Sequence, residues 1–207
     1  MERLAYFIKH RLKFLFPILE RVAALVTAVR YGKGRTEALS QASVSGTFGD
    51  KKCVIRALKG EDAVSVSELL QRSTDPHTEY FHPHKFDVAS VRKVIQSSSF
   101  MTYGLLLDDR LIAYALLRLA PNGAAYIGRL VDAEFAGRGV GKYLARYLYW
   151  QAGIAGFRPR STISQQNYAS LKSHESVADY NVIATLPNDY VMVEFDTNLT
   201  HAPSLIL

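Results

Sequence analysis

The sequence predicts an α/β (α+β) fold in which a mixed, largely antiparallel sheet is flanked by helices, with a helical extension at the N-terminus. From residue 51 onward, short segments with strand-type alternation take turns with longer segments of helical periodicity. Two pairs of strand-type segments are each separated by only three turn-forming residues, which predicts antiparallel hairpins. Helices that cover such a sheet bury its apolar faces, so a layered domain is expected.

The first thirty residues predict helix. Apolar residues recur there in steps of three and four, with basic residues largely between them: Leu4, Phe7, Ile8, Leu12 and Leu15. Pro17 is expected to end or kink this helix, or to open a second one. The second helix should stop near Gly32 and Gly34. Residues 32–50 are rich in Gly, Ser and Thr and predict a linker.

The main domain is expected to begin at residue 51. Strands and helices alternate there, and the chain closes with a hairpin. In order, the sequence predicts strand 53–57, helix 61–72, a polar loop over 73–86, helix 88–96, strands 101–107, 111–119 and 124–131, helix 139–152, strand 159–164, helix 167–176, and strands 182–186 and 190–195. The expected organisation is a basic amphipathic helical extension (1–31), a linker (32–50) and a main domain (51–200).

Positive charge is concentrated near the N-terminus. The 207-residue chain has a net charge of +6, from 25 Lys and Arg against 19 Asp and Glu. Residues 1–40 hold eight basic and three acidic residues, so the rest of the chain is nearly neutral. A basic amphipathic helix suits packing on the body or on another subunit, or contact with an anionic membrane surface. Nucleic acid is a third interpretation, but the body lacks interleaved aromatic and basic residues, so no nucleic-acid partner is expected.

Apolar runs and the cysteine count bear on compartment and metal content. No stretch reaches the roughly 18 apolar residues that cross a bilayer, and the run 22–29 is closed by Arg21 and Arg30. Glu20 and Arg21 also interrupt a signal-peptide pattern. A cytoplasmic protein is expected, peripheral to the inner face of the membrane if the extension binds lipid. Cys53 is the sole cysteine and lies in an apolar run, which predicts a buried thiol and excludes a cysteine-based metal cage.

The segment that carries chemistry joins strand 124–131 to helix 139–152. It contains three glycines and two cations: Gly137, Arg138, Gly139, Gly141 and Lys142. Glycines permit positive φ and close backbone approach, and the free N–H groups of a helix's first turn favour an anion. The spacing fits neither the Walker nor the dinucleotide-binding pattern. The segment therefore predicts a pyrophosphate cradle, the alternative being a turn that serves packing alone.

This segment resembles motif A of the GNAT acyltransferase superfamily, where Arg or Gln precedes two variable residues, Gly, a variable residue, and Gly or Ala. Residues 136–141 fill these positions, with Ala136 in place of the usual long polar residue. Residues 54–63 are similar to the family's opening strand and helix start, and residues 167–175 to its second motif. The resemblance covers residues 51–197 and implies a GNAT-like fold with acetyl-CoA as co-substrate.

The resemblance also implies where acetyl-CoA binds. In the family, the strand before the glycine turn splays from the following strand, and the pantetheine arm lies in the gap. Backbone groups of Leu130 and Val131 would bind the arm, and a backbone N–H near Leu130 or Val131 would steady the oxyanion. The cofactor-binding residues that the resemblance implies are Leu130, Val131, Arg138, Gly139, Val140, Gly141, Lys142, Asn167 and Ser170. No metal is expected.

The groups for proton transfer are candidate catalytic residues. His174 stands where the family usually has a tyrosine acid, and its protonated imidazole would serve the leaving thiolate. Strand 124–131 offers no carboxylate. The region between the first two helices often covers the acceptor site in the family, so Glu79, His82 and His84 are candidates to orient the amine or relay its proton. The two loop histidines lack a clear third metal ligand, which disfavours a metal site.

The function implied is an acyl-CoA-dependent N-acetyltransferase acting on a primary amine of a small molecule. Residues 81–86 and 185–190 faintly resemble GNAT proteins of bacterial surface-glycan pathways, which favours an amino sugar. One alternative is a protein or peptide amine as acceptor. The other is a non-catalytic GNAT-like module that binds CoA or a protein partner, motivated by Ala136, His174 and the missing strand carboxylate.

Overall fold

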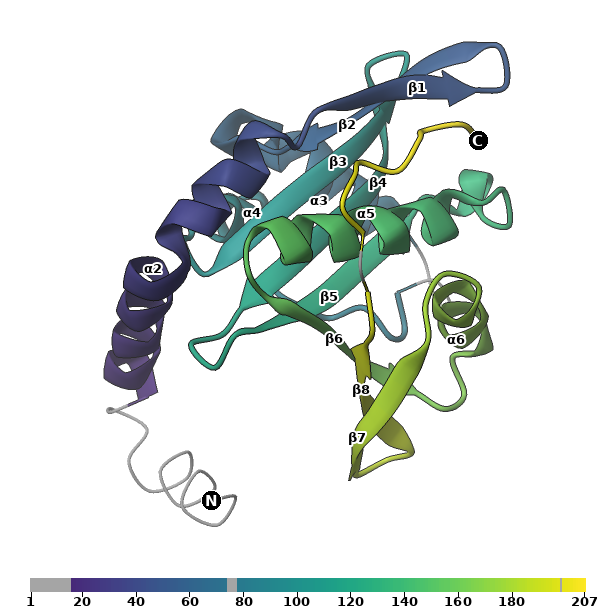
Figure 1. The fold of residues 1–207 in the computed structure, drawn as a ribbon. Helices are drawn as coiled ribbons and strands as arrows, with labels where there is room; N and C mark the ends of the chain where they lie inside the picture. The colour runs from purple at the N-terminus through teal and green to yellow at the C-terminus, as the bar shows by residue number, and fades with distance from the viewer. Residues whose placement is uncertain (1–15, 74–77, 198) are drawn as a thin grey trace.

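The computed structural model describes residues 16–73, 78–197 and 199–207, built around one eight-stranded sheet (Figure 1). The strand order is β1-β2-β3-β4-β5-β6-β8-β7, and β5–β6 is the parallel pair. The strands are β1 (Val44–Phe48), β2 (Lys51–Ala57), β3 (Phe100–Leu107), β4 (Arg110–Leu119), β5 (Ala124–Val131), β6 (Arg158–Ser164), β7 (Tyr180–Leu186) and β8 (Tyr190–Phe195). The helices are α2 (Phe16–Ser40), α3 (Ala63–Arg72), α4 (Val88–Gln96), α5 (Val140–Ile154) and α6 (Tyr168–Glu175), with 3-10 turns at Gly60–Asp62 and Ala133–Phe135. The predicted mixed, largely antiparallel sheet with flanking helices is confirmed.

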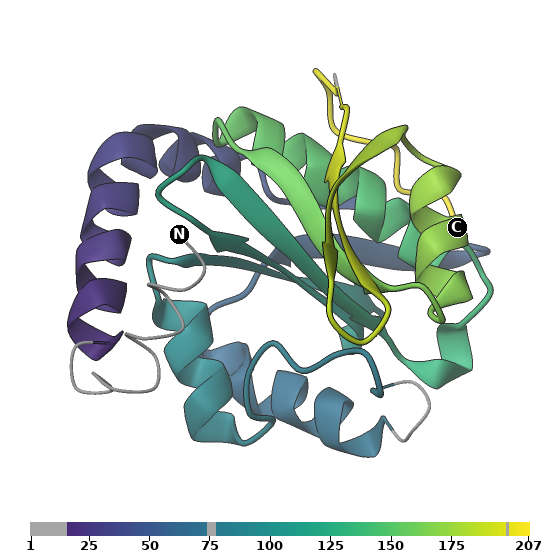
Figure 2. The same ribbon diagram turned by 90° about the horizontal axis from the view of Figure 1, so that it is seen from below.

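Helices cover both faces of the sheet (Figure 2). On one face, α3 and α4 bury a cluster in which Val66 and Leu69 pack with Tyr114 of β4. On the other face, α5 contributes Leu144 and Tyr147 to the larger core. The sheet therefore separates two apolar layers, as expected for a strand set whose central members are apolar on both sides.

Turn chemistry fixes the two hairpins that the sequence predicts. Asp108 and Asp109 have φ of 47° and 66°, and Asn188 and Asp189 have φ of 60° and 58°. Asp and Asn tolerate this left-handed region better than other non-glycine residues, and two consecutive positive φ angles match the twist of a tight hairpin. The turn residues thus set the register of β3 on β4 and of β7 on β8.

Two expectations about the N-terminal region are corrected. The helix expected to stop near Gly32 and Gly34 continues through both as α2. A Cβ at Gly34 would lie 2.8 Å from the carbonyl oxygen of Ala155, so this glycine permits close helix packing rather than ending the helix. Residues 32–50 are not a linker, because they form the end of α2 and strand β1. The helix predicted over the first fifteen residues lies outside the described residues.

The C-terminal residues complete the sheet edge. The amide of Thr47 donates to the carbonyl of Leu205, and the amide of Leu207 donates to the carbonyl of Thr47. Gly46 makes this approach feasible, because a Cβ there would lie 1.8 Å from the carbonyl oxygen of Leu205. Strand β1, which the sequence analysis missed, is therefore paired on both sides, by β2 and by the end of the chain.

Candidate active site

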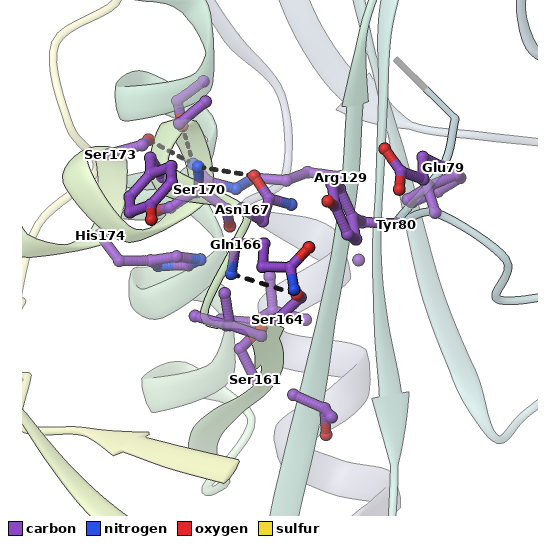
Figure 3. Close-up of a pocket in the computed structure, with 18 of the residues that line it drawn as sticks. Glu79, Tyr80, Arg129, Ser161, Ser164, Gln166, Asn167, Ser170, Ser173 and His174 are labelled. Carbon is purple, nitrogen blue, oxygen red and sulfur yellow. Dashed lines mark hydrogen bonds between the residues drawn. The ribbon is translucent and has the colours of Figure 1, made fainter. Parts of the chain in front are cut away.

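A gap in the middle of the sheet is the main feature of the site. Strands β5 and β6 pair only over three residues at the start of each, from Ala124 with Arg158 to Tyr126 with Arg160. Beyond this point they diverge, and a cavity of about 630 Å³ opens between them. Its wall combines β5, β6, the first turn of α5, helix α6 and the loop after α3 (Figure 3).

The register of β5 determines which backbone groups face this gap. The amide of Asp132 donates to the carbonyl of Ile112 of the neighbouring β4. Because peptide groups alternate along a strand, the groups of Leu130 also point to β4, whereas those of Arg129 and Val131 point to β6. Of the two residues expected to contact the arm through their backbone, Val131 therefore directs its peptide groups toward the gap. Leu130 instead buries its side chain on the α3–α4 face.

The glycine turn shapes the N-terminus of α5. Gly137 and Gly139 have φ of 73° and 86°, and Gly139 is the N-cap residue. The first helical bond runs from the Tyr143 amide to the Gly139 carbonyl, so the amides of the preceding helical residues have no partner in the helix. These are the amides of Val140, Gly141 and Lys142. Arg138 is exposed beside them and lies over the ring of Phe135.

A buried carboxylate anchors the strand end that precedes the turn. Asp132 accepts hydrogen bonds from Arg72 at 2.8 Å and from Arg110 at 3.1 Å. Burial alone would raise the pKa of the Asp132 carboxyl, but the hydrogen bonds from Arg72, the Glu134 amide and Arg110, with the charge of Arg72, together lower the net pKa. Its other oxygen accepts from the amide of Glu134. The start of the glycine turn is thus held to α3 and β4.

Arg129 reaches from β5 across the gap to the helices on the other side (Figure 3). Its guanidinium donates to the carbonyl of Gly141 and, at 2.8 Å, to the hydroxyl of Ser173. Burial lowers the pKa of Arg129 to about 10, so the group stays protonated near neutral pH. Its hydrogen bonds go to carbonyl and hydroxyl oxygens, and no carboxylate among the described residues pairs with its positive charge. No sequence motif had marked Arg129 as a site residue.

Helix α6 brings two of the expected cofactor residues into the cavity wall. Asn167 is its N-cap, and the side-chain oxygen accepts from the Ser170 amide at 3.1 Å. Both residues line the cavity opposite β5. The cap explains why an Asn begins this helix: it satisfies an otherwise unpaired amide and leaves its own NH₂ group free to face the gap.

His174 lies at the back of the cavity and is almost fully buried. Its Nδ1 shares a hydrogen bond with the hydroxyl of Tyr149, and its ring stacks on Phe195 with centroids 4.5 Å apart. Burial, aided by the charge of Arg129, lowers the pKa of His174 to about 2. The imidazole is therefore neutral near pH 7, which corrects the expectation of a protonated imidazole acid: a desolvated cation beside an arginine is disfavoured.

Of the three candidate catalytic residues in the loop between α3 and α4, one lines the cavity and two do not. Glu79 lines the cavity and enters from the side of β5 opposite α6 (Figure 3). His82 is exposed and stacks on Phe86. Both ring nitrogens of His84 are engaged, one by the carbonyl of Lys85 at 2.7 Å and the other by the hydroxyl of Tyr114 at 3.0 Å. Neither histidine lines the cavity, and His84 ties the loop to the sheet.

Several polar lining residues were not anticipated. They come from β6, from the turn after it, from the loop beside Glu79 and from β8: Ser161, Ser164, Gln166, Tyr80 and Tyr190. Strand β6 is unusually polar for the interior of a sheet, with Ser-Thr-Ile-Ser followed by two glutamines. That composition is the signal that would have marked this strand as a cavity wall.

The residues present fit a long, pyrophosphate-bearing acyl carrier. Free amides and positive φ at the glycine turn suit the pyrophosphate, and the unpaired edge of β5 can bond an amide-containing arm. Among the described residues, no group of three His, Cys, Asp or Glu side chains is placed to hold a metal ion. Fold and site together define a CoA-dependent acyltransferase.

Comparison with known proteins identifies the family. The acetyltransferase (GNAT) family model matches residues 65–178, more than half of the chain, and the chain belongs to this family. It is accordingly an acetyl-CoA-dependent N-acetyltransferase. No curated protein matches its sequence.

Solved structures share the fold at low sequence identity. The chain is similar to the GNAT domain of S. lividans PAT, with a TM-score of 0.67 and 16% identity over 76% of this chain and 98% of that one. It is similar to the aminoglycoside acetyltransferase AAC(6')-Ib in complex with coenzyme A, with a TM-score of 0.57 and 20% identity over 70% and 94%. It is also similar to the PaiA N-acetyltransferase from Thermoplasma acidophilum in complex with coenzyme A, with a TM-score of 0.57 and 17% identity over 69% and 97%.

Proposed function

We propose that this enzyme transfers the acetyl group of acetyl-CoA to a primary amine on a small, hydroxyl-rich molecule of the amino-sugar class. The observation that carries the proposal is that one cavity is lined both by Gly141, in the first turn of α5, and by Glu79, in the loop after α3. A donor held at the cradle and an acceptor held at the loop would meet inside the same gap.

The donor end of the site is built mainly from backbone. The amides of Val140, Gly141 and Lys142 would bind the pyrophosphate, and Arg138 and Lys142 would add side-chain charge. The peptide groups of Val131 and Arg129 would bond the pantetheine arm along the free edge of β5. When bound, acetyl-CoA supplies an activated thioester, and the protein's part is to position it and exclude water.

The acceptor end offers one carboxylate. Glu79 is the acidic side chain that lines the cavity within the described residues. A primary amine is protonated near neutral pH and must lose a proton before it can attack. We assign to Glu79 the attraction of the ammonium group and the removal of that proton, directly or through water. His174, being neutral and hydrogen-bonded to Tyr149, is assigned a positioning role in the wall.

The lining chemistry favours a polar acceptor body. Ten of the twenty lining residues carry a hydroxyl or amide group: Ser161, Thr162, Ser164, Gln166, Asn167, Ser170, Ser173, Tyr80, Tyr168 and Tyr190. Such groups pair with sugar hydroxyls as donors and as acceptors. The structural neighbour AAC(6')-Ib is described in complex with kanamycin, an aminoglycoside, which supports an amino-sugar acceptor without defining which one.

The test incubates the purified protein with acetyl-CoA and a panel of amines and measures turnover as the release of CoA. The panel should contain free and nucleotide-linked amino sugars, an aminoglycoside, a polyamine and a lysine-containing peptide. We expect turnover with an amino sugar. Turnover with the peptide alone would favour a protein acceptor, and tight CoA binding without any turnover would favour a non-catalytic module.

A matched pair of variants tests the assigned base. Glu79→Gln should lower kcat/KM for the amine by roughly 100-fold or more, because general-base catalysis contributes about that much, while CoA affinity stays the same. Glu68→Gln, an exposed carboxylate on α3, is the control and should behave as wild type. Equal activity of the two variants would exclude Glu79 as the base.

A further inference from the structure

The outward face of α2 carries an apolar stripe that no described element covers. Its members are between 46% and 81% exposed: Ile18, Val22, Leu25, Val26 and Val29. They recur in steps of three and four, so they lie along one face of the helix. A contiguous row of large apolar side chains in water marks a surface that contacts something else.

The opposite face of α2 already holds the helix to its own domain. Thr27 and Ala38 are buried, and the ring of Tyr31 lies 4.2 Å from the ring of Phe157. Gly34 lies close against the carbonyl of Ala155 at the end of α5. The N-terminal part of α2 projects past the sheet (Figure 1). The exposed stripe is therefore additional to the contacts that fix the helix on the body.

Positive charges border the stripe. By helical spacing, Arg21 and Arg30 lie on its two opposite sides, and Lys33 follows one turn after Val29. No acidic residue occurs between residues 21 and 36, and Glu20 falls on the face away from the stripe. The preceding fifteen residues add four basic residues against one acidic residue in the sequence. The surface thus combines apolar area with cationic edges.

We propose that this face of α2 docks the enzyme on an anionic lipid membrane. An interfacial helix buries an apolar face at the boundary of headgroups and acyl chains, while its flanking cations meet lipid phosphates. Docking of a second copy through the same face would bring two strongly basic segments together, which repel. No helix in the described part of the chain is long and apolar enough to cross a membrane, so the contact is peripheral.

The experiment measures sedimentation of the full-length protein with vesicles. One set is pure phosphatidylcholine and the other contains 30% phosphatidylglycerol, at 50 and 300 mM salt. We expect binding to the anionic vesicles, weaker binding at high salt, and little binding to the neutral set. Val22→Glu combined with Val29→Glu should weaken binding at least tenfold. Arg21→Gln combined with Arg30→Gln should weaken it by roughly 10- to 30-fold, at about fivefold per cation.

Controls separate surface chemistry from loss of fold. Val64→Glu places the same change at an exposed valine on α3, and Lys52→Gln with Arg146→Gln removes two exposed cations elsewhere. These variants should bind as wild type, and all variants should keep the CoA affinity. Undiminished vesicle binding by the Val22 and Val29 double variant would overturn the proposal. A second result would also overturn it: the wild-type protein binds no vesicles but forms a dimer by light scattering, and the Val22 and Val29 double variant does not form that dimer.

Discussion

The charge at one glycine position offers a direct test of the pyrophosphate cradle. Gly139 caps α5 with φ of 86°, and a Cβ there would meet only Leu207 Cδ2, at 3.6 Å. Asn and Asp tolerate positive φ, and every non-glycine residue with positive φ in the described chain is one of these two. Gly139→Asn and Gly139→Asp therefore carry similar strain and differ in charge alone.

The expected difference follows from Coulomb's law. A carboxylate about 6 Å from one phosphate charge costs about 0.7 kcal/mol at a dielectric constant of 80 and about 2.8 kcal/mol at 20. The Gly139→Asp variant should thus bind CoA roughly threefold to 100-fold more weakly than the Gly139→Asn variant. Because the cradle is exposed, salt should reduce the difference.

Calorimetric titration with CoA at 50 and 300 mM salt measures this difference. The control pair is Gly156→Asn and Gly156→Asp, because Gly156 has φ of 79° at the opposite end of α5. That end is about 22 Å away along a 15-residue helix. The control pair should bind CoA equally. Equal CoA affinity within the Gly139 pair would show that the pyrophosphate does not lie at this turn.

Two further predictions concern stability. Asp132→Asn should lower the free energy of unfolding by about 1–3 kcal/mol at pH 7, because the three hydrogen bonds that Arg72 and Arg110 donate to this carboxylate lose their charge assistance. The folded-state pKa of Asp132 is lowered, so its contribution to stability is complete above about pH 5 and is lost as the pH falls through the folded-state pKa. Denaturant titrations at low pH should therefore give the variant and the wild type the same free energy of unfolding. Gly46→Ala should lower the melting temperature, because its Cβ would meet the Leu205 carbonyl at 1.8 Å, and the matched Gly153→Ala, with open space on α5, should not. An unchanged melting temperature for the Gly46 variant would contradict the tight packing of the C-terminal segment.

Much of the fold could be predicted because its signals are local. Strand β5 was predicted with its observed bounds, since an apolar run is framed by a Pro-Asn-Gly turn and by the glycine segment. The hairpin turns were likewise visible as Asp and Asn residues. Strand β1 was missed because Val-Ser-Gly-Thr-Phe reads as a loop in isolation. It becomes a strand by pairing with β2 and the C-terminal residues, which are far from it in the sequence.

The candidate site divides in the same way. The cradle at Gly139 depends on a few consecutive residues, so spacing and glycine content could reveal it. The protonation state and hydrogen bonds of the histidines could not be predicted, because the residues that bury and contact them belong to other elements. Tyr149 and Phe195 contact His174, and Tyr114 forms a hydrogen bond with His84. The pKa shift of a titratable residue depends on its neighbours in space, which the sequence does not specify.

By itself, the sequence determined the order of elements from residue 51 onward, the glycine turn and the concentration of positive charge near the N-terminus. These features depend on residue type and short-range spacing. Only the tertiary structure decided that β5 and β6 separate after three paired residues, that Arg129 spans the resulting gap, and that Glu79 faces into it. It also decided that α2 leaves an apolar face exposed. The physical reason is that strand pairing, burial and desolvation are set by contacts between residues distant in the chain.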